Sequence, residues 1–241
     1  MNRLVIVTGA SRGLGLAICR QLLQQGYTVL ALARTLSIDL NALTEQYGSD
    51  LTFVSADLSD LDNIQPLCSE LIKQHGRPYA LINNAAVGYD GVLATMHNSE
   101  INALLNLNVQ APILLTKYLL RPMLLNQSGR IINISSIIAR TGFNGLSVYA
   151  ASKAALEGFT KSLSREVGKA GITVNCVAPG YMQTEMTNSL QGDKLESIKR
   201  RSPLGRLATP DDAAGAVLYL LSEQAAAITG TTITVDTGST A

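Results

Sequence analysis

Short, almost continuously apolar runs recur along the whole chain, and this pattern constrains the fold more than any other feature. The seven runs are Arg3–Thr8, Tyr27–Ala33, Leu51–Ala56, Tyr79–Asn83, Arg130–Ser135, Ile172–Ala178 and Thr231–Val235. Strands that read as unbroken apolar runs are covered on both faces. Segments with helical spacing lie between them, including Gly13–Gln25, Asp60–His75 and Glu157–Lys169. The alternation predicts a doubly wound α/β domain of about seven parallel strands with helices on both faces.

The composition fits one large domain rather than two small ones. The chain has 241 residues, of which 46% are hydrophobic and 15% charged, so it holds enough apolar material for a large core. Because no linker divides it, we expect a single domain over residues 1–241. The polar stretch Met182–Pro203 departs from the alternation and predicts a substrate loop or lid, with an exposed helix pair as the alternative. Pro112 and Pro122 are expected to kink or segment a helix.

Charge, cysteines and histidines exclude several classes of protein. A net charge of +1 gives no basic surface for nucleic acid. His75 and His97 lack other ligand residues at suitable spacing, so no metal site is expected. Polar residues interrupt the apolar-rich Val109–Leu125, so no membrane span is expected. The three cysteines, Cys19, Cys68 and Cys176, are widely spaced and odd in number. We expect them to be small buried apolar residues of a protein in the reducing cytoplasm. We therefore expect a cytoplasmic protein.

A glycine-rich turn follows the first predicted strand and opens the first predicted helix. Its spacing over Thr8–Gly15 is G-x-x-x-G-x-G rather than the common G-x-G-x-x-G. Glycines there allow a pyrophosphate to approach backbone amides at the helix N-terminus. A tight turn without a ligand is the alternative, but the position between strand and helix favours phosphate binding. The residues expected at the cofactor are Gly9, Ser11, Arg12, Gly13, Leu14 and Gly15.

The end of the second predicted strand indicates which dinucleotide is bound. An acidic residue at this point would accept hydrogen bonds from a ribose and favour NAD. Here Ala33 is followed by Arg34, and Arg12 lies in the glycine turn. Two guanidinium groups suit a ribose 2′-phosphate, so the sequence predicts NADP (NADPH) as the cofactor. If Arg34 is only a solvated charge, the preference stays open.

A tyrosine and a lysine four residues apart share one helical face and suggest acid–base chemistry. A phenol has a pKa near ~10, and a neighbouring ammonium such as that of Lys153 would lower the pKa of Tyr149. The tyrosine would then serve as an acid or base near neutral pH. Ser136, which closes a predicted strand, would hydrogen-bond a substrate carbonyl.

Together these motifs resemble the short-chain dehydrogenase/reductase family, whose fold is of the Rossmann type, and specifically its compact NADP-using members. The resemblance runs from Val7 to Asp236. It is carried by the Thr8–Gly15 turn, Asp57-Leu58, Asn83-Asn84-Ala85, Asn108, Ser136, Tyr149-x-x-x-Lys153, Asn175 through Pro179-Gly180, and Thr184. Two positions depart from the family pattern. Ala86 stands where glycine is usual, and Asp236-Thr237-Gly238 replaces a frequent Asp-Gly-Gly, which reads as a conservative turn change.

The resemblance implies a role for each site residue. Tyr149 is the general acid that protonates a carbonyl oxygen, and Ser136, thirteen positions earlier, orients that carbonyl. Lys153 holds the nicotinamide ribose and lowers the tyrosine's pKa, while Asn108 keeps the central helix open around a proton-relaying water. The other implied cofactor contacts are Asp57 and Leu58 at the adenine, Asn84 near the ribose, and Pro179, Gly180, Met182 and Thr184 at the nicotinamide.

Within the family the chain is most similar to 3-oxoacyl-acyl-carrier-protein reductases of fatty acid and polyketide-like pathways. The stretches that carry this similarity are Gly129–Ile132, Arg165–Val167, Gly171–Asn175, Pro179–Thr187 and Pro203–Arg206. They imply reduction of a 3-oxoacyl thioester and an acidic acyl carrier protein as partner. Two positions that are basic in those reductases read Gln127 and Ala170 here. Docking would therefore depend on Arg130, Lys161 and Lys169, which otherwise are solvated charges.

Three alternatives remain open. The chain could act on another ketone or secondary alcohol, or work oxidatively with NAD. It could also be a cofactor-binding regulatory protein, since fold does not dictate function. The segments Leu104–Leu125 and Tyr149–Leu163 resemble the family's helical interfaces, so a homo-oligomer, most simply a tetramer, is expected.

Overall fold

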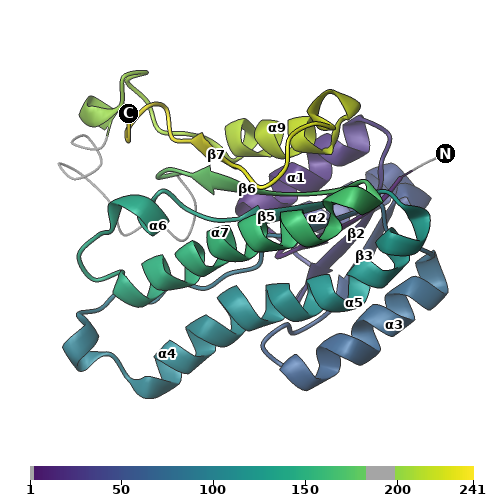
Figure 1. Cartoon of the computed structure of the whole chain (residues 1–241), viewed down its shortest axis with the longest axis horizontal. Coiled ribbons are helices and arrows are strands. Elements are labelled where there is room, and N and C mark those ends of the chain that lie inside the picture. Colours follow the sequence, from purple (N-terminus) through teal and green to yellow (C-terminus); the bar gives the residue numbers. More distant parts are fainter. Residues whose placement is uncertain (1–2, 183–198) are drawn as a thin grey trace.

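The structure is a computed structural model that describes residues 3–182 and 199–241. Its centre is one seven-stranded sheet in the order β3-β2-β1-β4-β5-β6-β7, and every neighbouring pair is parallel (Figure 1). The strands are β1 (Leu4–Thr8), β2 (Thr28–Ala33), β3 (Leu51–Ser55), β4 (Ala80–Asn83), β5 (Gly129–Ile134), β6 (Ile172–Pro179) and β7 (Thr232–Val235). The seven predicted strands, their parallel arrangement and the single doubly wound domain are confirmed. Each predicted strand boundary lies within one residue of the observed one.

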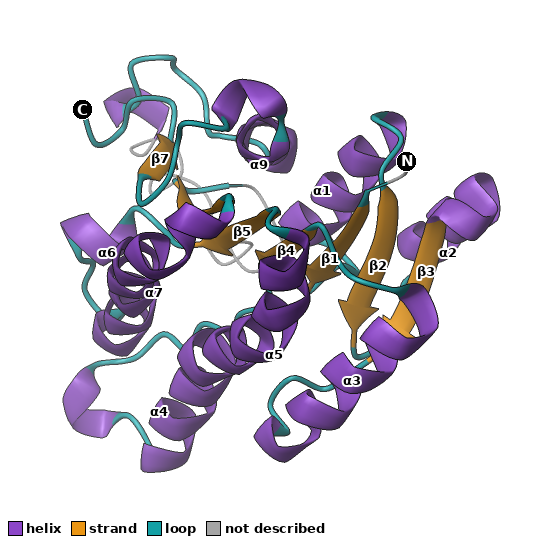
Figure 2. Cartoon of the chain, turned by 45° about the vertical axis from the view of Figure 1, so that its right-hand side comes forward, coloured by secondary structure: helices purple, strands orange, loops and turns teal. Residues whose placement is uncertain are grey.

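Helices cover both faces of the sheet, as the unbroken apolar runs predict (Figure 2). One face carries α1 (Gly13–Gln24), α2 (Ile38–Tyr47) and α9 (Pro210–Leu221). The other carries α3 (Ile64–His75), α5 (Ala111–Asn126) and α7 (Ser147–Val167). The short 3₁₀ helices are η1 (Gly48–Asp50), η2 (Leu61–Asn63), η3 (Leu93–Thr95), η5 (Gly168–Ala170) and η7 (Glu223–Ala225).

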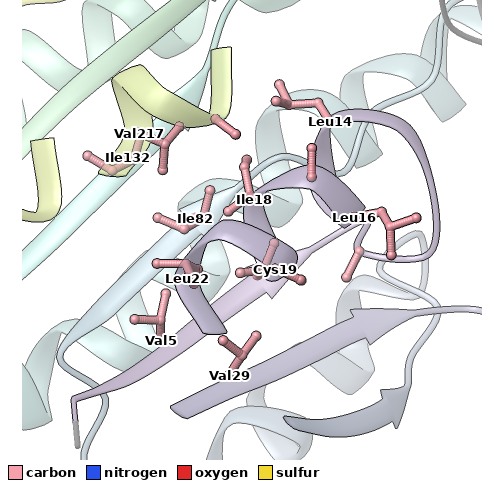
Figure 3. Packing of buried hydrophobic residues seen from close by; sticks show 14 of the residues in the cluster. Val5, Leu14, Leu16, Ile18, Cys19, Leu22, Val29, Ile82, Ile132 and Val217 are labelled. Atoms are coloured by element: carbon pink, nitrogen blue, oxygen red, sulfur yellow. The ribbon is translucent and has the colours of Figure 1, made fainter. Parts of the chain in front are cut away.

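Successive residues of a central strand pack into different core layers. On β1, Val5 and Val7 contact the layer under α1, whereas Ile6 contacts the layer under α3 and α5. Figure 3 shows Ile18 and Leu22 of α1 among Val5 and Ile82 of the sheet and Val217 of α9, and both are fully buried. Each such side chain stabilises the fold by roughly 1.5–3 kcal/mol relative to its exposed state. Cys19, Cys68 and Cys176 are all buried, as their spacing indicated.

The central helix is segmented ahead of Pro112. Helix α4 (Asn98–Leu105) passes into a π-helical turn, η4 (Asn106–Gln110), and α5 begins directly after it. Pro112 directly follows this turn, at the second residue of α5, and has no N–H to donate to the preceding helical turn. Pro122 lies inside α5, which continues to Asn126. π-helical turns are rare and concentrate at functional sites.

The predicted substrate loop falls largely on residues 183–198, which lie outside the described residues. On its near side, Met182 pairs with Ala208 in an isolated parallel bridge. On its far side, the buried Ser202 donates a hydrogen bond to the carbonyl of Thr237 at 2.9 Å. Among the described residues no helix is both long and apolar enough to span a bilayer.

Candidate active site

The carboxyl ends of β1, β4, β5 and β6 meet at one edge of the sheet. The chain winds outward from β1 through β2 to β3 and then returns to β4 on the other side of β1. Ligands of open α/β sheets bind at such a reversal of strand order. The glycine turn, Asn84, Ser136 and Gly180 follow these four strands, so the structure brings them to the same edge.

The glycine turn has no room for side chains at two positions. A Cβ on Gly15 would lie 2.1 Å from the carbonyl oxygen of Gly9, and one on Gly9 would lie 2.9 Å from the Cα of Ala85. Gly9 also has a φ of +65°, a conformation that favours glycine. The turn therefore packs directly on the backbone that follows β4, and of its three glycines only Gly13 is exposed.

Asn84 and Thr8 fasten this turn to β4. The Asn84 amide donates to the carbonyls of Thr8 (2.9 Å) and Gly9 (3.2 Å). The Thr8 hydroxyl donates to the Ile82 carbonyl at 3.2 Å and accepts from the backbone N–H groups of Asn84 and Ala85, both at 2.9 Å. Asn84 thus shapes the turn itself, a role that the sequence did not indicate.

A second bridge joins the two loops that carry arginines. Ser37 donates to the carbonyl of Ser11 at 2.5 Å and accepts from the backbone N–H of Leu40 at 3.1 Å, which caps α2. Arg12 and Arg34, on the joined loops, both have exposed side chains. Ser37 was not among the site residues expected from the sequence, although a serine just before a helix is a recognisable N-cap.

Of the two residues predicted at the adenine, one is exposed and one belongs to the core. Asp57 is exposed, and hydrogen bonds from Ser59 hold the pKa of its carboxyl below the ordinary value. Leu58 is buried and packs in the core layer with Ile64 and Cys68. Its side chain serves packing, so only its backbone is available to a ligand.

Ser136, Tyr149 and Lys153 converge at the carboxyl end of β5. Tyr149 and Lys153 lie one turn apart on α7, and the Lys153 Nζ is 5.6 Å from the centre of the Tyr149 ring. That ammonium donates to the carbonyl of Ile134, the last residue of β5, at 2.9 Å. The Ser136 side chain lies beside Tyr149 and lowers the pKa of its phenol. The three predicted residues therefore form one cluster.

Burial sets the protonation of this cluster. It lowers the pKa of Lys153 to about 8 and raises the pKa of Tyr149 to about 12, an increase that the hydrogen bond from Ser136 partly offsets. In the chain by itself, burial outweighs any lowering of the tyrosine's pKa by Lys153, so that expectation stays a prediction. The penalty for burying a phenolate is larger, and the ammonium points at a carbonyl of β5. At neutral pH Tyr149 holds its proton.

Asn108 ties the cluster to the rest of the site. It is fully buried in η4, where its carbonyl accepts from the Val87 N–H and its amide donates to the Val87 carbonyl, both at 2.9 Å. The same amide lies 3.2 Å from the hydroxyl of Ser152, which donates to the Tyr149 carbonyl at 2.7 Å. The π-helical turn thus directs one amide toward both the loop after β4 and α7.

The end of β6 packs on the C-terminal turn. A Cβ on Gly180 would lie 2.7 Å from the Cβ of Asp236, which explains the glycine after Pro179. Thr237 has a φ of +60°, a strained conformation for a β-branched residue. The change from Asp-Gly-Gly is therefore not conservative for the backbone. Thr184 lies outside the described residues.

The structure corrects the expectation that Arg130 helps to dock an acidic partner. Arg130 is buried at the amino end of β5, the end opposite to Ser136, where it donates to the Gly129 carbonyl at 2.9 Å. Its guanidinium lies 5.6 Å from the centre of the Tyr79 ring and 3.9 Å from Glu223. Because the guanidinium is buried against Tyr79 and pairs with Glu223, its charge is not available to a docking partner. Lys161 and Lys169 are exposed.

Comparison with known proteins places these features in a family. The family model described as enoyl-(acyl carrier protein) reductase matches residues 9–240. The chain is 38% identical to a 3-oxoacyl-[acyl-carrier-protein] reductase of Vibrio harveyi, across 98% of this chain and 97% of that protein. It is 39% identical to nodulation protein G of Rhizobium sp., across 98% and 96%.

A solved structure has nearly the same fold. It is described as an NAD(P)-dependent gluconate 5-dehydrogenase from Beutenbergia cavernae with bound NADP at low occupancy. It superimposes with a TM-score of 0.92 at 33% identity, across 98% of this chain and 96% of the other. From the site geometry, the family match and these relatives together, this chain belongs to the short-chain dehydrogenase/reductase family.

Proposed function

We propose that this chain is an NADPH-dependent ketoreductase that reduces the 3-oxo group of an acyl thioester to the 3-hydroxy product. The observation that carries the proposal is the convergence of Ser136 and Tyr149 beside the buried Lys153. Two hydroxyl groups that converge on one point suit a single carbonyl oxygen that must be held and then protonated. The Vibrio harveyi relative, described as a 3-oxoacyl-[acyl-carrier-protein] reductase, supports the choice of substrate.

The residues at the strand ends fit NADP. Gly9 and Gly15 have no space for a side chain, so the turn is tight, and it leads into the N-terminus of α1, where backbone amides suit a pyrophosphate. Arg12 and Arg34 are exposed on loops that Ser37 joins, and their guanidinium groups suit a 2′-phosphate. The solved structure with NADP supports the same choice. When bound, NADPH supplies the hydride. The other cofactor contacts predicted from the sequence remain part of this proposal.

The protein's own residues then handle the proton. Tyr149, whose pKa is about 12, is protonated at neutral pH and donates to the carbonyl oxygen. Ser136 holds that oxygen by a second hydrogen bond. The ammonium of Lys153 favours the phenolate left on Tyr149, and Asn108 fixes α7 through Ser152.

A substrate panel tests the proposal. NADPH oxidation is followed with acetoacetyl thioesters of a carrier protein and of coenzyme A, with 5-ketogluconate and with a crotonyl thioester. We expect the acetoacetyl thioesters to be reduced fastest. Faster reduction of 5-ketogluconate would move the assignment to the activity named for the solved structure, and faster reduction of the crotonyl thioester would indicate an enoyl reductase. Faster turnover with NADH would overturn the cofactor choice.

Two partner assignments belong to the same proposal. An acidic carrier protein would meet the exposed Lys161 and Lys169, while Gln127, Ala170 and Arg130 offer it no accessible charge. A preference for the carrier-protein thioester over the coenzyme A thioester, lost when both lysines are changed to Gln, would support this docking. An equal rate with both thioesters would contradict it. A cytoplasmic location follows from the proposed substrate.

A further inference from the structure

A buried carboxylate on α7 contacts both sides of the short segment that carries Ser136. Glu157 is 7% exposed and accepts hydrogen bonds on both carboxylate oxygens. Ser135 donates to its Oε1 at 3.0 Å, and the Nε of Arg140 donates to its Oε2 at 2.9 Å. Ser135 directly precedes Ser136, and Arg140 lies in α6 (Ile138–Thr141), which begins two residues after it.

The same carboxylate lies on the helical face of α7 that carries the proposed catalytic residues. Glu157 lies one turn beyond Lys153 and two turns beyond Tyr149, so the three residues lie close to one helical face. The Ser135 hydroxyl also lies 3.2 Å from the carbonyl oxygen of Lys153. The segment 135–140 is therefore bound to α7 through side chains at both of its ends, with Ser136 between them.

Stability alone does not account for this ion pair. Removing a carboxylate from water is costly, and apolar replacements of a buried ion pair are often neutral or stabilising. Arg140 is 47% exposed along its side chain, so its guanidinium is not forced to seek a buried partner. What the pair does supply is a fixed placement of α6 against α7, since the carboxylate accepts from two donors in defined directions.

We propose that Glu157, together with Arg140 and Ser135, is a positioning group that sets the separation of the Ser136 and Tyr149 hydroxyls. The inference depends on the proposed roles of Ser136 and Tyr149 in catalysis. Small displacements of reacting groups are costly, of the order of 100-fold in rate for about 1 Å. Glu157 would therefore act on the chemical step through Ser136 and leave cofactor binding unchanged.

The test compares Glu157→Gln with a matched control, Glu223→Gln. Glu223 also forms an ion pair with an arginine, Arg3, at 2.5 Å, but at the amino end of the strands. Steady-state rates are measured with NADPH and acetoacetyl-coenzyme A, or with whichever ketone of the panel is reduced fastest. We expect Glu157→Gln to lower kcat by about 10- to 100-fold. The dissociation constant for NADPH, from its fluorescence, should change less than about twofold, and Glu223→Gln should leave both quantities unchanged.

A second comparison separates positioning from a general structural effect. In a Ser136→Ala background the group that Glu157 positions is gone, so Glu157→Gln should cause no further loss of kcat. The same fold loss in both backgrounds would overturn the inference, as would a kcat for Glu157→Gln within twofold of wild type. Full activity of Ser136→Ala would instead overturn the proposed function.

Variants of the partly exposed arginine cover the case in which Glu157→Gln does not fold. Arg140→Lys keeps the charge without the fixed Nε direction, and should lower kcat less than Arg140→Gln. Arg140→Gln leaves the buried carboxylate without its cation, so adding Glu157→Gln to it should recover part of the rate. Equal rates for wild type, Arg140→Lys and Arg140→Gln would contradict the proposal.

Discussion

At the scale of single residues, the burial of Lys153 determines how the site responds to pH. Its pKa of about 8 lies below the ordinary 10.5, because burial disfavours the ammonium. We expect kcat to fall as pH rises through about 8, where the charge that favours the Tyr149 phenolate is lost. The measurement is a kcat–pH profile. Lys153→Arg, whose guanidinium does not titrate in this range, should abolish the inflection, and an unchanged profile in that variant would assign it to another group.

The free energy of unfolding should respond to the same lysine with the opposite sign. Its pKa is lower in the folded chain than in the unfolded chain, so between pH about 8 and 10.5 the unfolded chain binds more protons. Lys153 therefore makes the protein more stable as pH rises through this window. Urea unfolding at several pH values, compared with Lys153→Met, isolates this contribution. If the free energy of unfolding changed with pH in the same way for wild type and Lys153→Met, Lys153 would not be the group responsible.

Tyr149 is the residue whose loss should stop the chemistry without disturbing the fold. Tyr149→Phe removes the hydroxyl proposed to donate the proton and keeps the ring. General acid catalysis typically contributes 10²–10⁴-fold, so kcat should fall by about that factor while NADPH affinity changes little. Rates and cofactor fluorescence on the same preparation check this. Full activity of the phenylalanine variant would exclude the tyrosine as the acid.

At Thr237, backbone strain lowers the stability of the chain while the hydrogen bonds of the side chain raise it. Its φ is +60°, and its hydroxyl donates to the Arg206 carbonyl at 2.9 Å and hydrogen-bonds Ser202. Thr237→Val keeps the strain and loses these bonds, so it should destabilise the chain by about 1–3 kcal/mol. Thr237→Gly loses the same bonds but relieves a strain of about 1–2 kcal/mol, so its net effect should be much smaller. Thermal unfolding of both variants checks the difference. An equal loss of stability in the two variants would show that backbone strain at position 237 does not contribute.

At the scale of elements, the glycine turn and α9 respond oppositely to an added methyl group. A Cβ on Gly15 would lie 2.1 Å from the Gly9 carbonyl oxygen, so Gly15→Ala must displace the turn and should weaken NADPH binding by more than about tenfold. A Cβ on Gly215 of α9 would meet none of the described atoms within 4 Å. Gly215→Ala should therefore stabilise the chain by about 0.5–1 kcal/mol. A fluorescence titration with NADPH measures the first effect, and thermal unfolding measures the second. Tight NADPH binding by Gly15→Ala would contradict the proposed role of the turn in cofactor binding.

The elements themselves were largely predictable. Unbroken apolar runs predicted all seven strands, because strands that are covered on both faces cannot alternate with polar residues. The π-helical turn η4 was not predicted, since a single inserted residue in a helix leaves no periodic trace in so short a segment. That turn nevertheless determines where the Asn108 amide lies.

At the scale of the whole molecule, the exposed apolar side chains of α5 are relevant to assembly. Leu125 is 64% exposed and Leu124 is 41% exposed, which fits the expected homo-oligomer. Light scattering should give about four times the 25.6 kDa chain mass for a tetramer, and Leu125→Asp should lower that mass. A monomer at working concentration would refute the expectation.

The amino-acid sequence is enough to assign the class of fold and to single out the residues of the proposed site. Periodicity depends on burial, and motifs such as Tyr149-x-x-x-Lys153 are local, so both can be read along one chain. Only the tertiary structure decided how the site is charged and held together. The high pKa of Tyr149, the burial of Arg130 and the contact of Glu157 with Ser135 all depend on what packs around them. Desolvation and hydrogen-bond direction arise between segments distant in sequence, and no local pattern records them.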